Sequence, residues 1–86
     1  MENKILVKIY VPMLDETFDI FVPVNEYIWK MNRLLIGPIG ELSNNALPVD
    51  KNYIFVNSET GMIYDNNMII INTDIRNATK LTLLDV

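Results

Sequence analysis

Alternating apolar and polar residues open the chain and predict two strands. In residues 5–11 every second side chain is apolar, and a period of two is typical of a strand with one buried face. The alternation returns in residues 17–22, after a turn that contains Pro12 and the polar pair Asp15 and Glu16. The two segments therefore predict an antiparallel hairpin.

The next apolar residues recur at the spacing of a helix. Asn25 is a suitable N-cap and Glu26 suits a first turn, so we expect a helix that begins near Glu26. Gly37 and Pro38 predict a break or kink, although an apolar spacing of three continues to about Asn44. One kinked helix and two short helices both remain open. The stripe expected to face the core consists of Ile28, Met31, Leu34 and Leu35.

The second half of the chain predicts three further extended segments. Residues 53–56 are a continuous apolar run and read as a third strand. A polar turn separates them from residues 62–64, the short outer arm of a second hairpin, and residues 80–84 form the last strand.

This element order predicts an α+β fold, with one main helix packed on a mixed four- to five-stranded sheet in a single domain, residues 1–86. In this β-grasp layout the first and last strands pair in parallel at the centre of the sheet. We therefore expect Ile5 and Val7 to lie next to Leu81 and Leu83.

Composition limits the chemistry open to the chain. With 7 Lys+Arg against 11 Asp+Glu and a net charge of -4, binding to nucleic acid is disfavoured. The absence of Cys and His excludes thiolate catalysis, Cys/His zinc sites and histidine bases from this sequence. Asp15 and Glu16 are adjacent in a turn and lack a third ligand. We expect no catalytic residue, no cofactor and no metal site.

The apolar runs are also short. The longest fall well below the ~20 residues that span a bilayer, and the mixed charge of the first residues does not suit a secretory signal. We expect a cytoplasmic protein without membrane insertion.

The closing part of the chain carries a resemblance to a known family. Residues 70–83 present an apolar residue, a polar turn, Ile75, a second polar turn and a strand with alternating Leu81 and Leu83. This order resembles the closing loop and strand of ubiquitin-like proteins. Among bacterial members, the short hairpin, single helix and abrupt end are similar to the YukD-like small proteins that accompany type VII secretion systems. Gly37-Pro38 in the helical region and the Asn- and Pro-rich stretch before the third strand depart from that pattern.

The resemblance implies a noncatalytic adaptor, accessory to a bacterial type VII secretion system, whose partner is a secretion-system protein or a second copy of the chain. An accessory protein of a phage or mobile element is an alternative. A carrier or modifier is disfavoured, because such proteins end in a glycine pair and this chain has no glycine after Gly61.

The sheet face opposite the helix is the candidate binding surface. It is apolar by alternation, and contiguous exposed apolar surface usually marks an interaction site. In ubiquitin-like proteins the matching face contacts partners, which implies that role here. The alternative is that residues 45–52 cover part of it, or that its apolar residues are ordinary surface. The protein-interaction residues predicted here are Leu6, Lys8, Phe21, Phe55 and Leu84.

Overall fold

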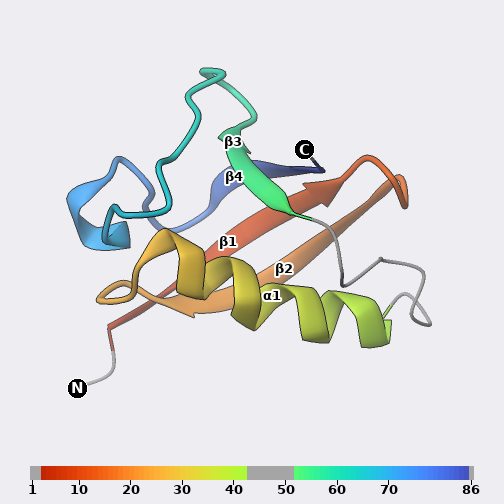
Figure 1. The fold of residues 1–86 in the computed structure, drawn as a ribbon, viewed down its shortest axis with the longest axis horizontal. Helices are drawn as coiled ribbons and strands as arrows, with labels where there is room; N and C mark the ends of the chain where they lie inside the picture. Colours follow the sequence, from red (N-terminus) through yellow and green to blue (C-terminus); the bar gives the residue numbers. More distant parts are fainter. Residues whose placement is uncertain (1–2, 43–51, 86) are drawn as a thin grey trace.

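The first two strands form the predicted hairpin. A computed structural model describes residues 3–42 and 52–85. In it, β1 (Lys4–Val11) pairs antiparallel with β2 (Glu16–Pro23) (Figure 1). The turn between them is closed by backbone hydrogen bonds, and its last residue takes a left-handed conformation, with φ at 50°.

The remaining strands complete a mixed sheet. β4 (Thr79–Asp85) lies parallel to β1, and β3 (Tyr53–Asn57) lies antiparallel to β4. The strand order β2-β1-β4-β3 therefore puts the first and last strands at the centre. The α+β layout expected from the sequence, one main helix on a mixed four-stranded sheet, is confirmed.

The register of the central pair differs from the expected one. Leu81 lies opposite Ile9 rather than Ile5, and Val7 lies opposite Thr79. The loop that precedes β4 lies beside the start of β1 instead, and the Leu6 N–H donates to the Asn77 side chain at 2.9 Å. A strand cannot reach that part of β1 while the loop holds it.

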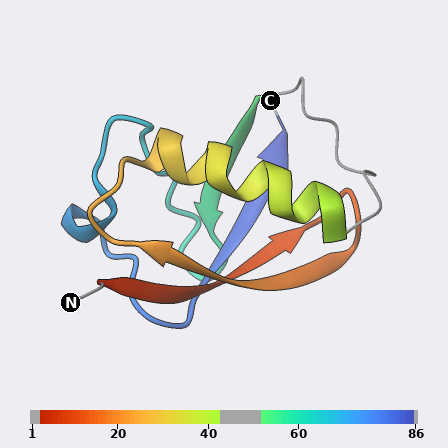
Figure 2. The ribbon, with the colours of Figure 1, turned by 90° about the horizontal axis from the view of Figure 1, so that it is seen from below.

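Residues Ile28–Leu42 form one continuous helix, where the sequence left two possibilities open. Helix α1 (Ile28–Leu42) runs through Gly37 and Pro38 without a break, and it lies across one face of the sheet (Figure 2). Pro38 is exposed, so its ring faces solvent while the opposite side of the helix packs. The expected continuation to Asn44 lies outside the described residues.

The start of α1 shows a correction to the expected cap. The helix begins at Ile28, whose N–H donates to the Met68 carbonyl at 2.9 Å, and the Trp29 N–H donates to the Asn66 carbonyl at 3.2 Å. The first helical N–H groups are therefore satisfied by backbone remote in sequence, rather than by Asn25. Sequence patterns of local caps do not carry this information.

The second half contains less strand than expected. Residues 62–64 make a single bridge, Val56 to Ile63, instead of a full strand. Further along the chain, residues Ile70–Asn72 form η1, a short 3-10 helix. Its first two N–H groups donate to the carbonyls of Glu26 and Val24, in the segment before α1. A single bridge thus takes the place of the second hairpin's outer arm.

The core lies between α1 and the sheet. The helix contributes Ile28, Met31, Leu35 and Ile39, whereas Leu34, expected in this stripe, is exposed. The buried apolar residues from the strands and loops are Val7, Ile9, Val11, Phe18, Val22, Tyr53, Phe55, Tyr64, Ile70, Ile75, Leu81 and Leu83.

Candidate protein-binding face

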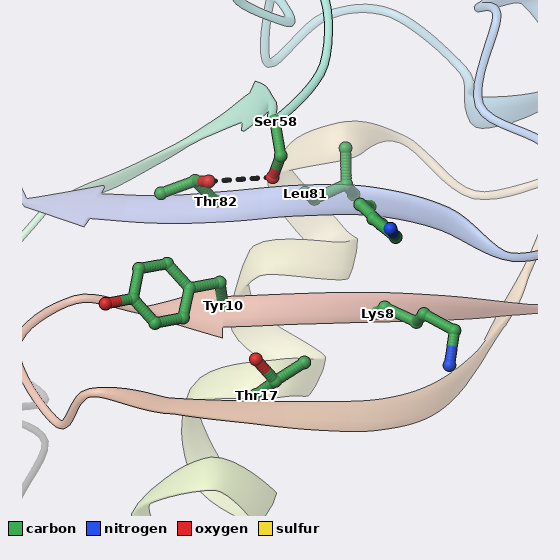
Figure 3. Close-up of a pocket in the computed structure, with 7 residues that line it drawn as sticks. Lys8, Tyr10, Thr17, Ser58, Leu81 and Thr82 are labelled. Carbon is green, nitrogen blue, oxygen red and sulfur yellow. Dashed lines mark hydrogen bonds between the residues drawn. The ribbon is translucent and has the colours of Figure 1, made fainter.

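The sheet has one face covered by the helix and one that no described helix or strand covers. We call the second the outer face. Figure 3 looks onto it, with the helix behind the strands. Its most exposed apolar side chain is Phe21, at 68%. Residues 45–52, proposed above as a cover, fall almost wholly outside the described residues.

Four of the five predicted interaction residues lie on this outer face. Leu6 and Lys8 alternate with buried β1 residues, and Phe21 lies opposite Leu6 on β2. Leu84 follows two buried leucines of β4, Leu81 and Leu83, and its side chain is exposed, at 37%. The structure therefore brings them to one surface, although not to one contiguous patch.

Phe55 was assigned to this face wrongly. Its side chain is fully buried in the core, at 0% exposure. Phe55 pairs with Leu83, which also faces the helix, and directly paired residues point to the same side of a sheet. The residues of β3 that do face outward are Ile54 and Val56, and neither was among the predicted interaction residues.

The outer face has two apolar corners with a polar centre between them. Leu6 and Phe21, paired across β1 and β2, form the first apolar corner. Ile54 and Leu84, paired across β3 and β4, form the second apolar corner. The centre contains lysine and hydroxyl side chains, so the expected single apolar patch is divided.

A shallow hollow occupies this polar centre (Figure 3). Its volume is about 340 Å3, and one wall carries a hydrogen bond of 2.8 Å between the hydroxyls of Ser58 and Thr82. Lys80 belongs to the hollow and faces outward, because it alternates with the buried leucines of β4, a signal that was present in the sequence. The residues that line the hollow are Lys8, Tyr10, Thr17, Ser58, Lys80, Leu81 and Thr82.

Of the two lysines in the hollow, Lys8 and Lys80, Lys8 forms an ion pair that is exposed to solvent. The Lys8 Nζ lies 3.4 Å from Asp19 Oδ1, and both side chains are more than a third exposed. Exposed pairs of this kind contribute about 0–1 kcal/mol. Lys8 is therefore free to exchange Asp19 for another acid at little cost.

Tyr10 is held at the edge of the hollow by the hairpin turn. Its hydroxyl donates to Asp15 Oδ1 at 2.9 Å. This hydrogen bond, followed by burial and the charge of Asp15, raises the pKa of Tyr10 above its usual value. Because folding favours the protonated phenol, the contribution to stability is complete below the usual pKa and is lost as the pH rises through the raised one.

Removing the carboxylate is expected to lower the Tyr10 pKa. In Asp15→Asn the phenol loses its charged acceptor, and asparagine tolerates the left-handed conformation of this position. A pH titration of the Tyr10 ring by carbon NMR measures the change. Asp65→Asn, in another turn, is the matched control and should leave that pKa unaltered. An unchanged value in Asp15→Asn would contradict the assignment.

A second polar cluster lies on the core side and ties loops together. The buried Tyr64 hydroxyl donates to Asp74 Oδ1 at 2.5 Å and accepts from Asn57 Nδ2 at 3.1 Å. Burial first, and then the bond to Asp74, raises the pKa of Tyr64. The side chains of this cluster form hydrogen bonds with one another, and these bonds connect the end of β3 to the loop before β4.

Residues 3–42 and 52–85 contain neither a cluster of metal-binding side chains nor a helix suited to crossing a membrane. Within these ranges no three His, Cys, Asp or Glu residues come together in a way that would hold a metal ion. Over the same ranges no helix has both the length and the apolar character needed to cross a membrane.

Comparisons with known proteins identify the fold. No protein-family model matches the chain, and no curated protein matches it. Among solved structures, the EccD5 ubiquitin-like domain from Mycobacterium xenopi aligns with a TM-score of 0.82 at 12% identity, covering 96% of this chain and 94% of that one. A chain of the MycP5-free ESX-5 inner membrane complex aligns with a TM-score of 0.81 at 9% identity.

The coverage of these neighbours is uneven. The alignment takes in 98% of this chain but 21% of the ESX-5 chain, so this chain spans about a fifth of that neighbour. A chain of the toluene 4-monooxygenase HD complex also aligns, with a TM-score of 0.75 at 7% identity over 96% of this chain and 99% of that one. The fold is thus a ubiquitin-like β-grasp, which this chain shares with the EccD5 domain, with part of a chain of the ESX-5 inner membrane complex and with a chain of the toluene 4-monooxygenase complex.

Proposed function

We propose that this chain is a noncatalytic, protein-binding ubiquitin-like domain of a type VII secretion system, acting in the cytoplasm as a single domain. Its outer face docks onto another protein of the apparatus. The ESX-5 and EccD5 neighbours support the secretion context, since both resemble the chain over nearly its whole length.

The observation that carries the proposal is the composition of the outer face. Two apolar corners lie on a surface that no described element covers, and one of them presents the highly exposed Phe21. Exposed apolar side chains grouped around polar ones are typical of interfaces, whose buried centre is apolar and whose polar groups orient the partner. The polar hollow lies between the corners and would be enclosed when a partner spans both.

Photo-crosslinking in cells that produce the protein tests this function. Benzoylphenylalanine at Phe21 or Leu84 is expected to capture a type VII secretion protein. The matched controls are Trp29 and Leu34 on the exposed side of α1, with exposed fractions of 41% and 46%. Capture from the helix positions alone would contradict the proposal. So would outer-face products that contain only a second copy of the chain, or no secretion protein.

A further inference from the structure

The charge on the outer face is opposite to that of the whole molecule. The chain carries a net charge of -4. Among the outward-pointing residues of the four described strands are three of the chain's seven basic residues, Lys4, Lys8 and Lys80, but only one acid, Asp19. A positive face on an acidic protein favours a negatively charged partner surface.

Two lysines meet at the centre of this face. Lys8 and Lys80 are direct partners in the parallel pairing of β1 with β4, on strands that lie about 4.8 Å apart. Like charges directly opposite each other are destabilising. Lys8 contacts Asp19, whereas Lys80 has no ion pair with any residue of the described ranges. The pair therefore carries positive charge that its surroundings do not neutralise.

Hydroxyl groups around the lysines add hydrogen-bond donors. Ser58 and Thr82 bond to each other, and whichever hydroxyl accepts retains its own proton to donate. Thr17 makes no hydrogen bond through its hydroxyl within the described part of the chain, while Tyr10 is committed to Asp15. Among the residues that the structure describes, no acid lines the hollow. Ammonium groups and free hydroxyls without a competing carboxylate are suited to an anion.

The apolar corners decide which anion the hollow accepts. An inorganic phosphate would leave the corners at Phe21 and Leu84 in water, and a nucleic acid would meet the repulsion of the acidic molecule. A peptide can place one carboxylate in the centre and apolar side chains on both sides, which complements all three parts of the face.

We propose that the outer face recognises an acidic segment of its partner protein, with one Asp or Glu carboxylate bound between Lys8 and Lys80 and apolar side chains on the two corners. This inference rests on the proposed function and specifies the chemistry of the partner. The carboxylate replaces Asp19 at Lys8 and supplies the counter-charge that Lys80 lacks.

A pair of synthetic peptides tests the recognition of the acid. One blocked peptide has a single glutamate and two leucines, with a glycine–serine spacer between the glutamate and each leucine so that the leucines can reach the two corners. Its counterpart has glutamine in place of the glutamate. Titration followed by nitrogen–proton NMR should shift the amides of Lys8, Tyr10 and Thr82. The glutamine peptide should bind about fivefold more weakly, and added salt should reduce this difference. Equal affinity, or shifts on α1, would overturn the inference.

Variants of the two lysines separate binding from folding. Lys8→Gln with Lys80→Gln should abolish the preference for the glutamate peptide. Lys80→Glu should abolish it while leaving the melting temperature unchanged or raised, because it relieves the repulsion from Lys8. Lys30→Gln with Arg33→Gln, on the exposed side of α1, is the control and should retain the preference. Retention of the preference in Lys80→Glu would overturn the inference.

The crosslinking experiment distinguishes this inference from the function on which it rests. If the Phe21 crosslink to a secretion protein persists at full yield in Lys8→Gln with Lys80→Gln, the inference fails while the proposed function stands. If that crosslink is absent from the unmodified protein, the proposed function fails. Loss of the crosslink in the double variant alone supports both.

Discussion

Replacing Phe55 with alanine is expected to lower the free energy of unfolding by about 3–5 kcal/mol, the cost of deleting a large buried aromatic side chain. Phe55 is fully buried among the residues of the core, opposite Leu83 on β4. A loss of this size is comparable with most of the stability of a small domain. Urea unfolding followed by circular dichroism measures it.

The same substitution on the outer face provides the control for Phe55. Phe21→Ala removes an equal number of atoms from a side chain that is already largely in water, so it should change stability by at most about 0.5 kcal/mol. Equal losses of unfolding free energy at the two positions would contradict the placement of Phe55 on the buried side of β3. Phe21→Ala should instead weaken partner capture, since its side chain belongs to the first apolar corner.

Replacing Pro38 with alanine is expected to raise the free energy of unfolding, by up to about 3 kcal/mol. Pro38 lies inside α1 and is exposed, so the substitution removes no core contact. The new N–H can donate to the Leu34 carbonyl, a hydrogen bond that proline cannot make, and the clash of the proline ring with that carbonyl is relieved. Thermal unfolding followed by circular dichroism gives the increase.

Gly37 offers a smaller change of the same sign for comparison. A Cβ at this position would meet nothing within 4 Å, so Gly37→Ala should stabilise by about 0.5–1 kcal/mol through the reduced freedom of the unfolded chain. A gain at Gly37 together with none at Pro38 would show that the helix around Leu34 differs from the one described.

Stabilised variants of α1 would also help to test the outer face. Gly37 and Pro38 are exposed residues of α1, and α1 lies behind the sheet when the hollow is viewed from the front (Figure 3). A background of Gly37→Ala with Pro38→Ala should therefore retain the peptide preference. Substitutions at Leu6, Phe21 or Lys80 could then be compared without loss of folded protein.

Alternation in the sequence located the outward residues of three strands. β1, β2 and β4 each mix apolar and polar residues with a period of two, so the phase of Lys8, Phe21 and Leu84 follows from the pattern. The run Tyr53 to Val56 is apolar at every position, so its pattern does not show which side chains face the core and which face outward. Its orientation depends on which side chains fill the space under the helix.

The amino-acid sequence by itself determined the order and type of the main elements, the parallel pairing of the first and last strands, and most of the outer face. These features follow from local periodicity and from rules of chain connection. The tertiary structure alone decided the burial of Phe55, the capping of α1 by the backbone near Met68 and the direct pairing of Lys8 with Lys80. Each depends on contacts between segments far apart in the chain, and the free energy of such contacts comes from packing and register that no local pattern encodes.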